Sequence, residues 1–377
     1  GTLFHLASEA APGWRKSSSG RFPIASSLPT QTGGTGRANW RDELPRGFRM
    51  SGEGLFYADV EEEGDQGKTK WVSAPFEVLG QCCDSSSNEW GTVIRFRDPR
   101  MVEHQKIIQH STFASREGGS AIASMLEREG LSCSANPGLL RTFFDRYRPS
   151  QVLTIASSTG WHHAAADKWV YLLPNGVVIG DGKEDVVLAP EAARSGDGTK
   201  EAGDLAAWQQ AVAQYAIGNS RHAFFMSAAF AGAMLAVNSE PSGGFHLVGK
   251  SRSGKSTAQF MAASVWGQAK ARVAQWRATA NGLEGMARAA SDGPLFLDEI
   301  GQADAKQAGD AIYMLANEAG KQRARVDGSA RERASWRTLF LSTGEIGLAT
   351  KRGEANRAAA AGLEVRLVNI EADAGAG

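Results

Sequence analysis

Disulfide-stabilised domains and zinc modules are the first classes that this sequence disfavours, because it contains little cysteine. Its 377 residues include three cysteines, of which Cys82 and Cys83 are adjacent and Cys133 stands alone, and no C-x-x-C pair occurs. Disulfide frameworks need more cysteines, and zinc modules need paired ligands. So few cysteines suit a reducing compartment, and we expect a cytoplasmic location.

An excess of charge of one sign and long apolar runs are also absent. The 41 Lys and Arg balance 41 Asp and Glu, so overall charge predicts no partner, and any basic binding site must be local. The longest apolar run, residues 223–237, is short for a membrane span, so we expect a buried helix and no membrane partner. No signal peptide is visible, and the first residue is Gly rather than Met, so we expect part of a longer protein.

Composition and periodicity divide the chain into three parts. Residues 1–48 are rich in Gly, Ser, Thr and Pro, which is typical of a linker or a disordered arm. Residues 49–190 predict a smaller α+β region of unknown role, and residues 204–377 predict an α/β domain that begins with two helices. The elements expected in the middle part are a hairpin of strands 71–83 and 89–96, helices 120–129 and 139–147, a strand 152–155, and a hairpin of strands 169–173 and 177–179.

The most informative motif lies at residues 249–256, which fit the pattern G-x-x-x-x-G-K-[ST] of phosphate-binding loops. An apolar run at 245–248 precedes it as a buried strand would, and an Ala-rich helical pattern at 256–265 follows it. Such a loop turns backbone N–H groups and the positive end of the helix dipole toward an anion. We therefore predict ATP binding. In a chain with 44 Gly the alternative is a chance match, which the flanking pattern disfavours.

Each residue type in the loop has a part in this prediction. Gly249 and Gly254 let the backbone approach a polyphosphate where a Cβ would collide. Lys255 would reach the β- and γ-phosphates, and the Ser256 hydroxyl would bind Mg²⁺. The expected nucleotide contacts are Gly249, Lys250, Ser251, Arg252, Ser253, Gly254, Lys255, Ser256 and Thr257.

A pair of carboxylates supplies the expected second half of the nucleotide site. Residues 294–299 read PLFLDE, the apolar-strand-plus-acid pattern called Walker B. Asp298 would hold Mg²⁺, and Glu299 would polarise the attacking water. The interval from Lys255 to Asp298 leaves room for one strand at 272–276 and one helix at 282–290. The alternative is that the two acids begin a solvent-facing turn.

A third apolar strand, residues 338–341, ends in two hydroxyl side chains, Ser342 and Thr343. In ring ATPases of the AAA+ type, a polar residue at this strand tip senses the γ-phosphate, so we count Thr343 among the catalytic candidates and keep Ser342 as the alternative. A helix is expected at 305–319, with Asp304 as its N-cap and Gly320 as its stop.

A basic segment, residues 321–337, lies between that helix and the strand. It holds six basic residues against two acidic ones around the tight-turn pair Asp327-Gly328. Helicases of superfamily III place a DNA-gripping element at this point, and Lys321, Arg323 and Arg325 would contact DNA. The alternative is a solvated charged hairpin.

The last expected elements are a helix over 345–361 and an apolar strand over 362–368 that contains Arg366. Arg366 is either a surface charge or an arginine finger that reaches the γ-phosphate of a neighbouring subunit. Arg357 is the second candidate for that role.

Together these motifs resemble the family called domain of unknown function 927. The resemblance is strong over 205–370 and weaker over 50–190. The segments that carry it are GGFHLVG..R.GK[ST]T, ASVWG, W.AT.NGLE, LFLDEIGQAD, YMLANEAGK.R, SWR..FLSTGEI and EVRLV, with WVSAPFEVLG, STGWH and VYLLPNGVVIG in the weaker part. Family members are superfamily-III-like AAA+ ATPases of prophages, plasmids and other mobile elements, often joined to primase modules.

The resemblance implies an AAA+/P-loop NTPase core, a parallel sheet with flanking helices, preceded by a smaller α+β domain. It implies an ATP-driven DNA helicase or replication protein that uses Mg²⁺, acts on single-stranded DNA and assembles as a homo-oligomeric ring, a hexamer. Family members usually continue past the position of Ala374, which implies a chain cut short at its C-terminus. The alternatives are a regulatory or defence AAA+ switch without unwinding and a small-molecule P-loop kinase.

Overall fold

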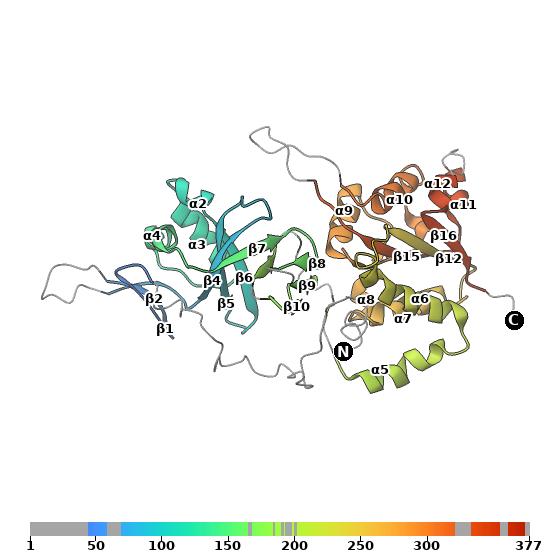
Figure 1. Ribbon diagram of the computed structural model, residues 1–377, viewed down its shortest axis with the longest axis horizontal. Coiled ribbons are helices and arrows are strands. Elements are labelled where there is room, and N and C mark those ends of the chain that lie inside the picture. Colours follow the sequence, from blue (N-terminus) through green and yellow to red (C-terminus); the bar gives the residue numbers. More distant parts are fainter. Residues whose placement is uncertain are drawn as a thin grey trace, which may run out of the picture. The chain divides into compact units, whose positions relative to one another are not determined.

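A computed structural model describes residues 44–58, 69–164, 168–183, 185–189, 192, 198–199, 202–320, 333–354 and 361–373. Their contacts divide the chain into two compact units (Figure 1). The N-terminal unit comprises Ser19–Ala156 and Glu184–Pro190, and the C-terminal unit includes Ser157–Lys183 and Glu191–Gly377. None of the helices described in either unit is long and apolar enough to cross a membrane.

The N-terminal unit contains a mixed five-stranded sheet and a small three-stranded sheet. The larger sheet has the order β11-β7-β4-β5-β6, with β4, β5 and β6 antiparallel and with β7 parallel to both β4 and β11. The β4–β5 pair confirms the expected hairpin, although residues 70–73 form a separate strand in the other sheet. The strands are β1 (Phe48–Ser51), β2 (Gly54–Tyr57), β3 (Lys70–Ser73), β4 (Glu77–Cys83), β5 (Gly91–Arg97), β6 (Glu103–Gln109), β7 (Val152–Ala156) and β11 (Val186–Leu188).

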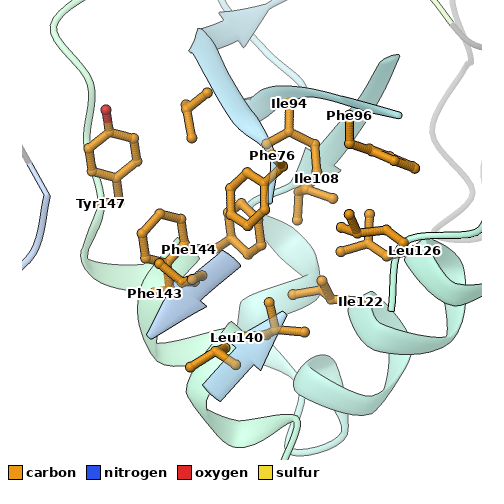
Figure 2. Close-up of a cluster of buried hydrophobic side chains, with 14 of the residues drawn as sticks. Phe76, Ile94, Phe96, Ile108, Ile122, Leu126, Leu140, Phe143, Phe144 and Tyr147 are labelled. Atoms are coloured by element: carbon orange, nitrogen blue, oxygen red, sulfur yellow. The ribbon is translucent and has the colours of Figure 1, made fainter. Parts of the chain in front are cut away.

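An aromatic core joins the larger sheet to three helices, α2 (Ser111–Ala114), α3 (Gly118–Arg128) and α4 (Gly138–Arg146). The helices α3 and α4 confirm the two expected amphipathic helices to within two residues at each end. Phe143 and Phe144 of α4 pack against Phe76 (Figure 2). Their ring centroids lie 5.6 and 5.8 Å from that of Phe76. Ile122 and Leu126, four residues apart on α3, complete the buried face of that helix.

The C-terminal unit is built on a five-stranded sheet of order β13-β14-β15-β12-β16, in which every paired strand is parallel to its neighbour. The central strands read as continuous apolar runs because helices cover both faces. The parallel sheet with flanking helices that the sequence predicted is confirmed. The strands are β12 (Gly243–Val248), β13 (Val273–Gln275), β14 (Gly293–Asp298), β15 (Thr338–Gly344) and β16 (Leu367–Glu371).

Successive residues of β14 point to opposite faces of this sheet and bury different helices. Leu295 and Leu297 belong to the cluster under α9 and α10, whereas Phe296 belongs to the cluster under α6 and α7. The two helix layers are visible on either side of the sheet in Figure 1. The helical segments are α5 (Leu205–Ala211), η2 (Ala213–Ala216), α6 (Ser220–Ala231), η3 (Gly232–Met234), α7 (Lys255–Ser264), α8 (Ala269–Arg272), α9 (Ala280–Ala289), η4 (Ile300–Gln302), α10 (Ala308–Ala316), α11 (Leu348–Gly353) and α12 (Ala361–Glu364).

A small sheet formed by β8 (Gly160–His163), β9 (Trp169–Leu172) and β10 (Val178–Gly180) also belongs to the C-terminal unit. The β9–β10 pair confirms the expected hairpin. The Trp161 indole donates to the Ala233 carbonyl at 2.9 Å, and the Tyr171 hydroxyl donates to the Asp292 carbonyl at 2.7 Å. The observed units therefore differ from the expected division into 49–190 and 204–377, because these long-range contacts attach Ser157–Lys183 to the C-terminal unit.

Two other expectations about element boundaries are wrong. The helix expected at 305–319 is the shorter α10, and Gln307 rather than Asp304 is its N-cap. The Asp304 carboxylate accepts instead from the N–H groups of Lys306 and Gln307, in the turn before the helix. The strand expected at 362–368 begins only at Leu367. The residues before it form α12, because Leu363 is fully buried in the cluster beneath α10 and a helical turn brings it there.

Asp292 lies where the small sheet meets the large one, and it makes stability depend on pH. Burial raises the pKa of its carboxyl from 3.8 to about 6, although the Trp161 N–H, which donates to it at 3.0 Å, and the charge of Arg337 oppose the shift. The native state therefore binds this proton more tightly than the unfolded state does. Its contribution to stability falls as pH rises from 4 to 6, by about 3 kcal/mol in all.

Asp292→Asn should remove this dependence, because an amide oxygen still accepts from Trp161 while no charge is buried. We expect the stability of the variant, relative to that of the wild type, to rise between pH 4 and pH 7, as measured by urea unfolding at both pH values. Asp181→Asn, which changes an exposed carboxylate of the same unit, is the control. Parallel pH profiles for Asp292→Asn and the wild type would contradict the prediction.

Candidate nucleotide site

Residues 249–256, which we call the glycine loop, join the C-terminal end of β12 to the N-terminus of α7. The Gly249 N–H donates to the Gly344 carbonyl at 3.2 Å, which ties the start of the loop to the end of β15. A Cβ on Gly249 would lie 2.9 Å from both the Ala372 Cβ and the Ser253 hydroxyl. Only glycine fits this position without a steric clash. The strand, loop and helix predicted from the motif are all present.

The glycine loop leaves most of its side chains exposed and curls through left-handed backbone. Arg252 has φ 65° and Gly254 has φ 84°, and Gly254 immediately precedes α7. Ser256 and Thr257, in the first turn of that helix, are exposed, as are Lys250, Ser251 and Arg252. The free N-terminal amides of α7 and its dipole therefore lie at the end of an open loop, which is a favourable place for an anion.

Lys255 is the exception, because its side chain is only 8% exposed. Its ammonium donates to the carbonyls of Gly249 and Lys250, at 2.8 and 2.7 Å. The long side chain thus folds back along the loop to which it belongs. A phosphate bound by the loop would compete with these two carbonyls for the same ammonium.

The acid pair at the end of β14 meets the tip of β15 directly. The Thr343 hydroxyl donates to the Asp298 carboxylate, and the Glu299 N–H donates to the same hydroxyl oxygen at 3.4 Å. Gly344, the next residue, is the one that holds the start of the glycine loop. Because β15 lies between β12 and β14, its tip brings the loop and the acid pair into one connected site.

Glu299 has an unusual backbone for a non-glycine residue, with φ 55° and ψ 78°. Its carboxylate accepts from the Gly301 N–H at 3.2 Å, which closes a short turn after the strand. Left-handed backbone at such a residue costs on the order of 1–3 kcal/mol, and strain of this kind clusters at functional sites. The carboxylate is partly exposed, so water can reach it.

The structure distinguishes the two hydroxyl candidates that the sequence left open. The Ile346 carbonyl can only accept, so Nε2 of His246 carries the ring hydrogen and donates to it at 3.0 Å. Nδ1 of the neutral ring therefore accepts from the Ser342 hydroxyl, which itself accepts from the Trp276 indole N–H, both at 2.8 Å. Burial, assisted by the charge of Lys255, lowers the pKa of His246 and keeps it neutral. Ser342 is thus enclosed in a structural network, and Thr343 alone faces the acid pair.

Two positioning residues at this site were not predicted from the sequence. Gln259, fully buried on α7, donates to the Leu341 carbonyl at 3.2 Å and places its own oxygen 3.4 Å from the Thr343 hydroxyl. Lys351, also buried, donates to the Gly301 carbonyl at 2.7 Å and so holds the turn that follows Glu299. Gln259 lies four residues after Lys255 on one helix face, the only hint that spacing provides.

The oxygen atoms of Ser256 and Asp298 fit the preferences of Mg²⁺, which takes carboxylate and hydroxyl ligands and retains several waters. Within the described ranges, no group of three or more His, Cys, Asp or Glu side chains gathers as a metal cluster. An ion at this site would therefore need phosphate oxygens of a substrate as further ligands. That these two residues hold Mg²⁺ stays a prediction.

Arg366 lies just before β16, at the opposite end of the strands from the glycine loop. Its carbonyl accepts from the Gly244 N–H, near the start of β12, whereas the glycine loop follows the end of that strand. Its guanidinium donates to the Gly362 carbonyl at 2.6 Å and lies 5.0 Å from the ring centroid of Tyr313. Among the described residues, its contacts include none of the nucleotide site, and a role across a subunit interface stays a prediction.

The remaining predicted site residues lie outside the described part of the chain. They are Lys321, Arg323 and Arg325 of the basic segment, and Arg357.

Two of three comparisons with known proteins found a similarity. A family model described as "Domain of unknown function (DUF927)" matches residues 48–335. A solved structure entitled "SCCmec type IV Cch - active helicase" is similar with a TM-score of 0.62 and 18% sequence identity, over 86% of this chain and 58% of that chain. No curated protein matches the sequence. The chain thus shares its fold with that structure and spans a little over half of its length.

Proposed function

The chain belongs to the family described as Domain of unknown function (DUF927), a description that assigns no activity, and we propose from the site itself that it is an ATP-hydrolysing DNA helicase or replication protein of a mobile genetic element. The observation that carries the proposal is the Thr343 contact with Asp298 beside the loop anchor Gly344. It joins a phosphate-binding loop to a metal-binding acid and a candidate base.

Binding of ATP follows from the glycine loop. The amides at the start of α7 and the Lys255 ammonium are arranged to meet negatively charged oxygens. On binding, Lys255 would exchange the carbonyls of Gly249 and Lys250 for the β- and γ-phosphate oxygens. Ser256 and Asp298 would hold Mg²⁺, which when bound offsets the charge that develops on the phosphates.

Hydrolysis needs a group that takes a proton from the attacking water, and Glu299 is suited to that role. Its carboxylate is partly exposed and is held by the Gly301 N–H. Thr343 donates to Asp298 and orients that carboxylate. Because Thr343 accepts from the Glu299 N–H, a change at the γ-phosphate would reach both acids through one hydroxyl.

The DNA partner is proposed on two grounds. The solved structure with the same fold is entitled a helicase, and residues 321–337 concentrate six basic residues against two acidic ones in a chain of zero net charge. That segment joins the helix after the acid pair to β15, so hydrolysis would move it. We further propose single-stranded DNA as the substrate, a homohexameric ring with Arg366 acting in the neighbouring subunit, a primase module as partner, and a cytoplasmic location.

The rate of ATP hydrolysis with and without single-stranded DNA tests the proposal. We expect Mg²⁺-dependent hydrolysis that DNA stimulates, and we expect Lys321→Ala, Arg323→Ala and Arg325→Ala, made together, to remove the stimulation while basal hydrolysis survives. Hydrolysis that DNA does not change would identify a regulatory or defence switch instead. Phosphate transfer to a small molecule would identify a kinase.

A further inference from the structure

The N-terminal unit contains a polar recess at which α3 and α4 begin. Its volume is about 540 Å³, and the first turn of α3 and one face of α4 line it. A Cβ on Gly119 would lie 2.4 Å from the Pro137 carbonyl, so this glycine allows the two helix N-termini to meet. The recess is several times larger than one water molecule and open enough to admit part of a polymer.

Three arginines line the recess, namely Arg116, Arg141 and Arg146. Arg141 is half-buried, and the other two are exposed. Within the part of the chain that the structure describes, no salt bridge or side-chain hydrogen bond engages any of the three. The acid that shares the recess, Asp145, is 4.0 Å from Arg148 and is thereby partly offset. Three guanidinium groups of one sign thus share the recess with one carboxylate, whose charge is partly offset by Arg148.

The helix ends add to this positive potential. Neither N-cap residue, Glu117 of α3 or Pro137 of α4, accepts a side-chain hydrogen bond from its helix. Of the first-turn amides, those of Gly118 and Leu139 donate to the carbonyls of Ser115 and Asn136. The positive dipole ends of the two helices, of 11 and 9 residues, both lie at the recess that the arginines line. The arginines supply the fork geometry that matches phosphate oxygens in pairs.

We propose that this recess binds the phosphate backbone of single-stranded DNA, and that the N-terminal unit is a DNA-holding module. Net charge is zero, so a local cluster is needed to attract DNA at all. The three arginines come from two segments of the chain, so they can contact successive phosphates of a strand without reading bases. The inference rests on the proposed DNA partner but not on the proposed ATP hydrolysis.

The test compares two matched triple variants of the full chain in the absence of nucleotide. One carries Arg116→Gln, Arg141→Gln and Arg146→Gln. The other carries Arg49→Gln, Arg97→Gln and Arg100→Gln, which remove the same charge from exposed positions of the same unit outside the recess. Fluorescence anisotropy with a labelled oligonucleotide, over a series of salt concentrations, gives the affinity and its salt dependence. Thermal unfolding checks that both variants fold.

We expect the recess variant to bind DNA about tenfold or more weakly at low salt, with a log–log salt slope reduced by about 2, as three single-strand phosphate contacts require. The control variant should lose much less affinity. Pyrophosphate at millimolar concentration should compete poorly, since a chain of phosphates occupies the recess. Equal affinities for both variants would overturn the proposal, and so would efficient competition by pyrophosphate, which would identify a free polyphosphate site.

This outcome is separable from that of the proposed function. A chain that hydrolyses ATP with DNA stimulation, but whose recess variant binds DNA like the control variant, refutes the recess alone. A chain that hydrolyses no ATP, but whose recess variant loses DNA affinity, refutes the proposed motor and supports the recess.

Discussion

Glu299→Gln should leave ATP binding intact and lower the rate of hydrolysis by about 10²–10⁴-fold, the range that a positioned general base contributes. The amide keeps the size of the side chain and still accepts from the Gly301 N–H, so the turn and its left-handed backbone persist. What disappears is the group that takes the proton from water. Single-turnover hydrolysis and equilibrium nucleotide binding, measured on the same preparation, separate the two effects.

Glu240→Gln, which changes an exposed carboxylate just ahead of β12, should hydrolyse ATP at the wild-type rate. Full hydrolysis by Glu299→Gln would remove Glu299 from its proposed role.

Mixing Glu299→Gln subunits with Arg366→Ala subunits extends the test to assembly. If Arg366 acts across an interface, some interfaces of a mixed ring pair an intact acid with an intact arginine, and part of the activity should return.

Lys255→Ala should weaken ATP binding by about 10²–10⁴-fold. Hydrogen bonds to charged groups contribute roughly 1.5–3 kcal/mol each, and the ammonium would make two of them, to the β- and γ-phosphates. The same substitution removes the two bonds that the ammonium makes to loop carbonyls. Part of the loss could therefore reflect a disordered loop.

Lys255→Met addresses that ambiguity, because it keeps an unbranched side chain at this buried position while removing the charge. It should bind ATP as poorly as Lys255→Ala. Lys270→Ala, which removes an exposed charge from α8, serves as the control. Isothermal titration with a non-hydrolysable ATP analogue measures all three. Wild-type affinity in Lys255→Met would show that the ammonium is not a phosphate ligand.

The glycine loop was predictable because its evidence is local. A strand, two glycines and a helix follow one another within some twenty residues, although the bond from Gly249 to the distant Gly344 could not be predicted from them. The β9–β10 hairpin was predictable for the same reason, since its turn residues fix the pairing of the strands they join.

Short apolar runs near Arg366 misled the sequence reading, because such a run fits a strand and a buried helical turn equally well. Leu363 packs under α10 from a helix, and the strand follows it. Nor could the sequence decide whether Ser342 or Thr343 faces the acid pair. It depends on which face of β15 meets Gln259 and Asp298 and which meets Trp276, and both faces are set by tertiary packing.

The unit boundary escaped prediction because nothing near residue 157 in the sequence marks it. Trp161 and Tyr171 find their partners, Ala233 and Asp292, 72 and 121 positions away. The arginine recess was hidden in the same way, since Arg116 joins Arg141 and Arg146 only when α3 and α4 pack together.

The interleaving of the two units bears on how such a gene can evolve. β7 and β11 are neighbours in one sheet of the N-terminal unit, yet the segment between them, Ser157–Lys183, belongs to the other unit. A recombination crossover at residue 157 would separate β11 from the rest of the N-terminal unit. A crossover after residue 190 would separate Trp161 and Tyr171 from the rest of the C-terminal unit. No single crossover transfers either unit whole. We therefore expect the two units to be exchanged only together, and the family match over 48–335 spans both.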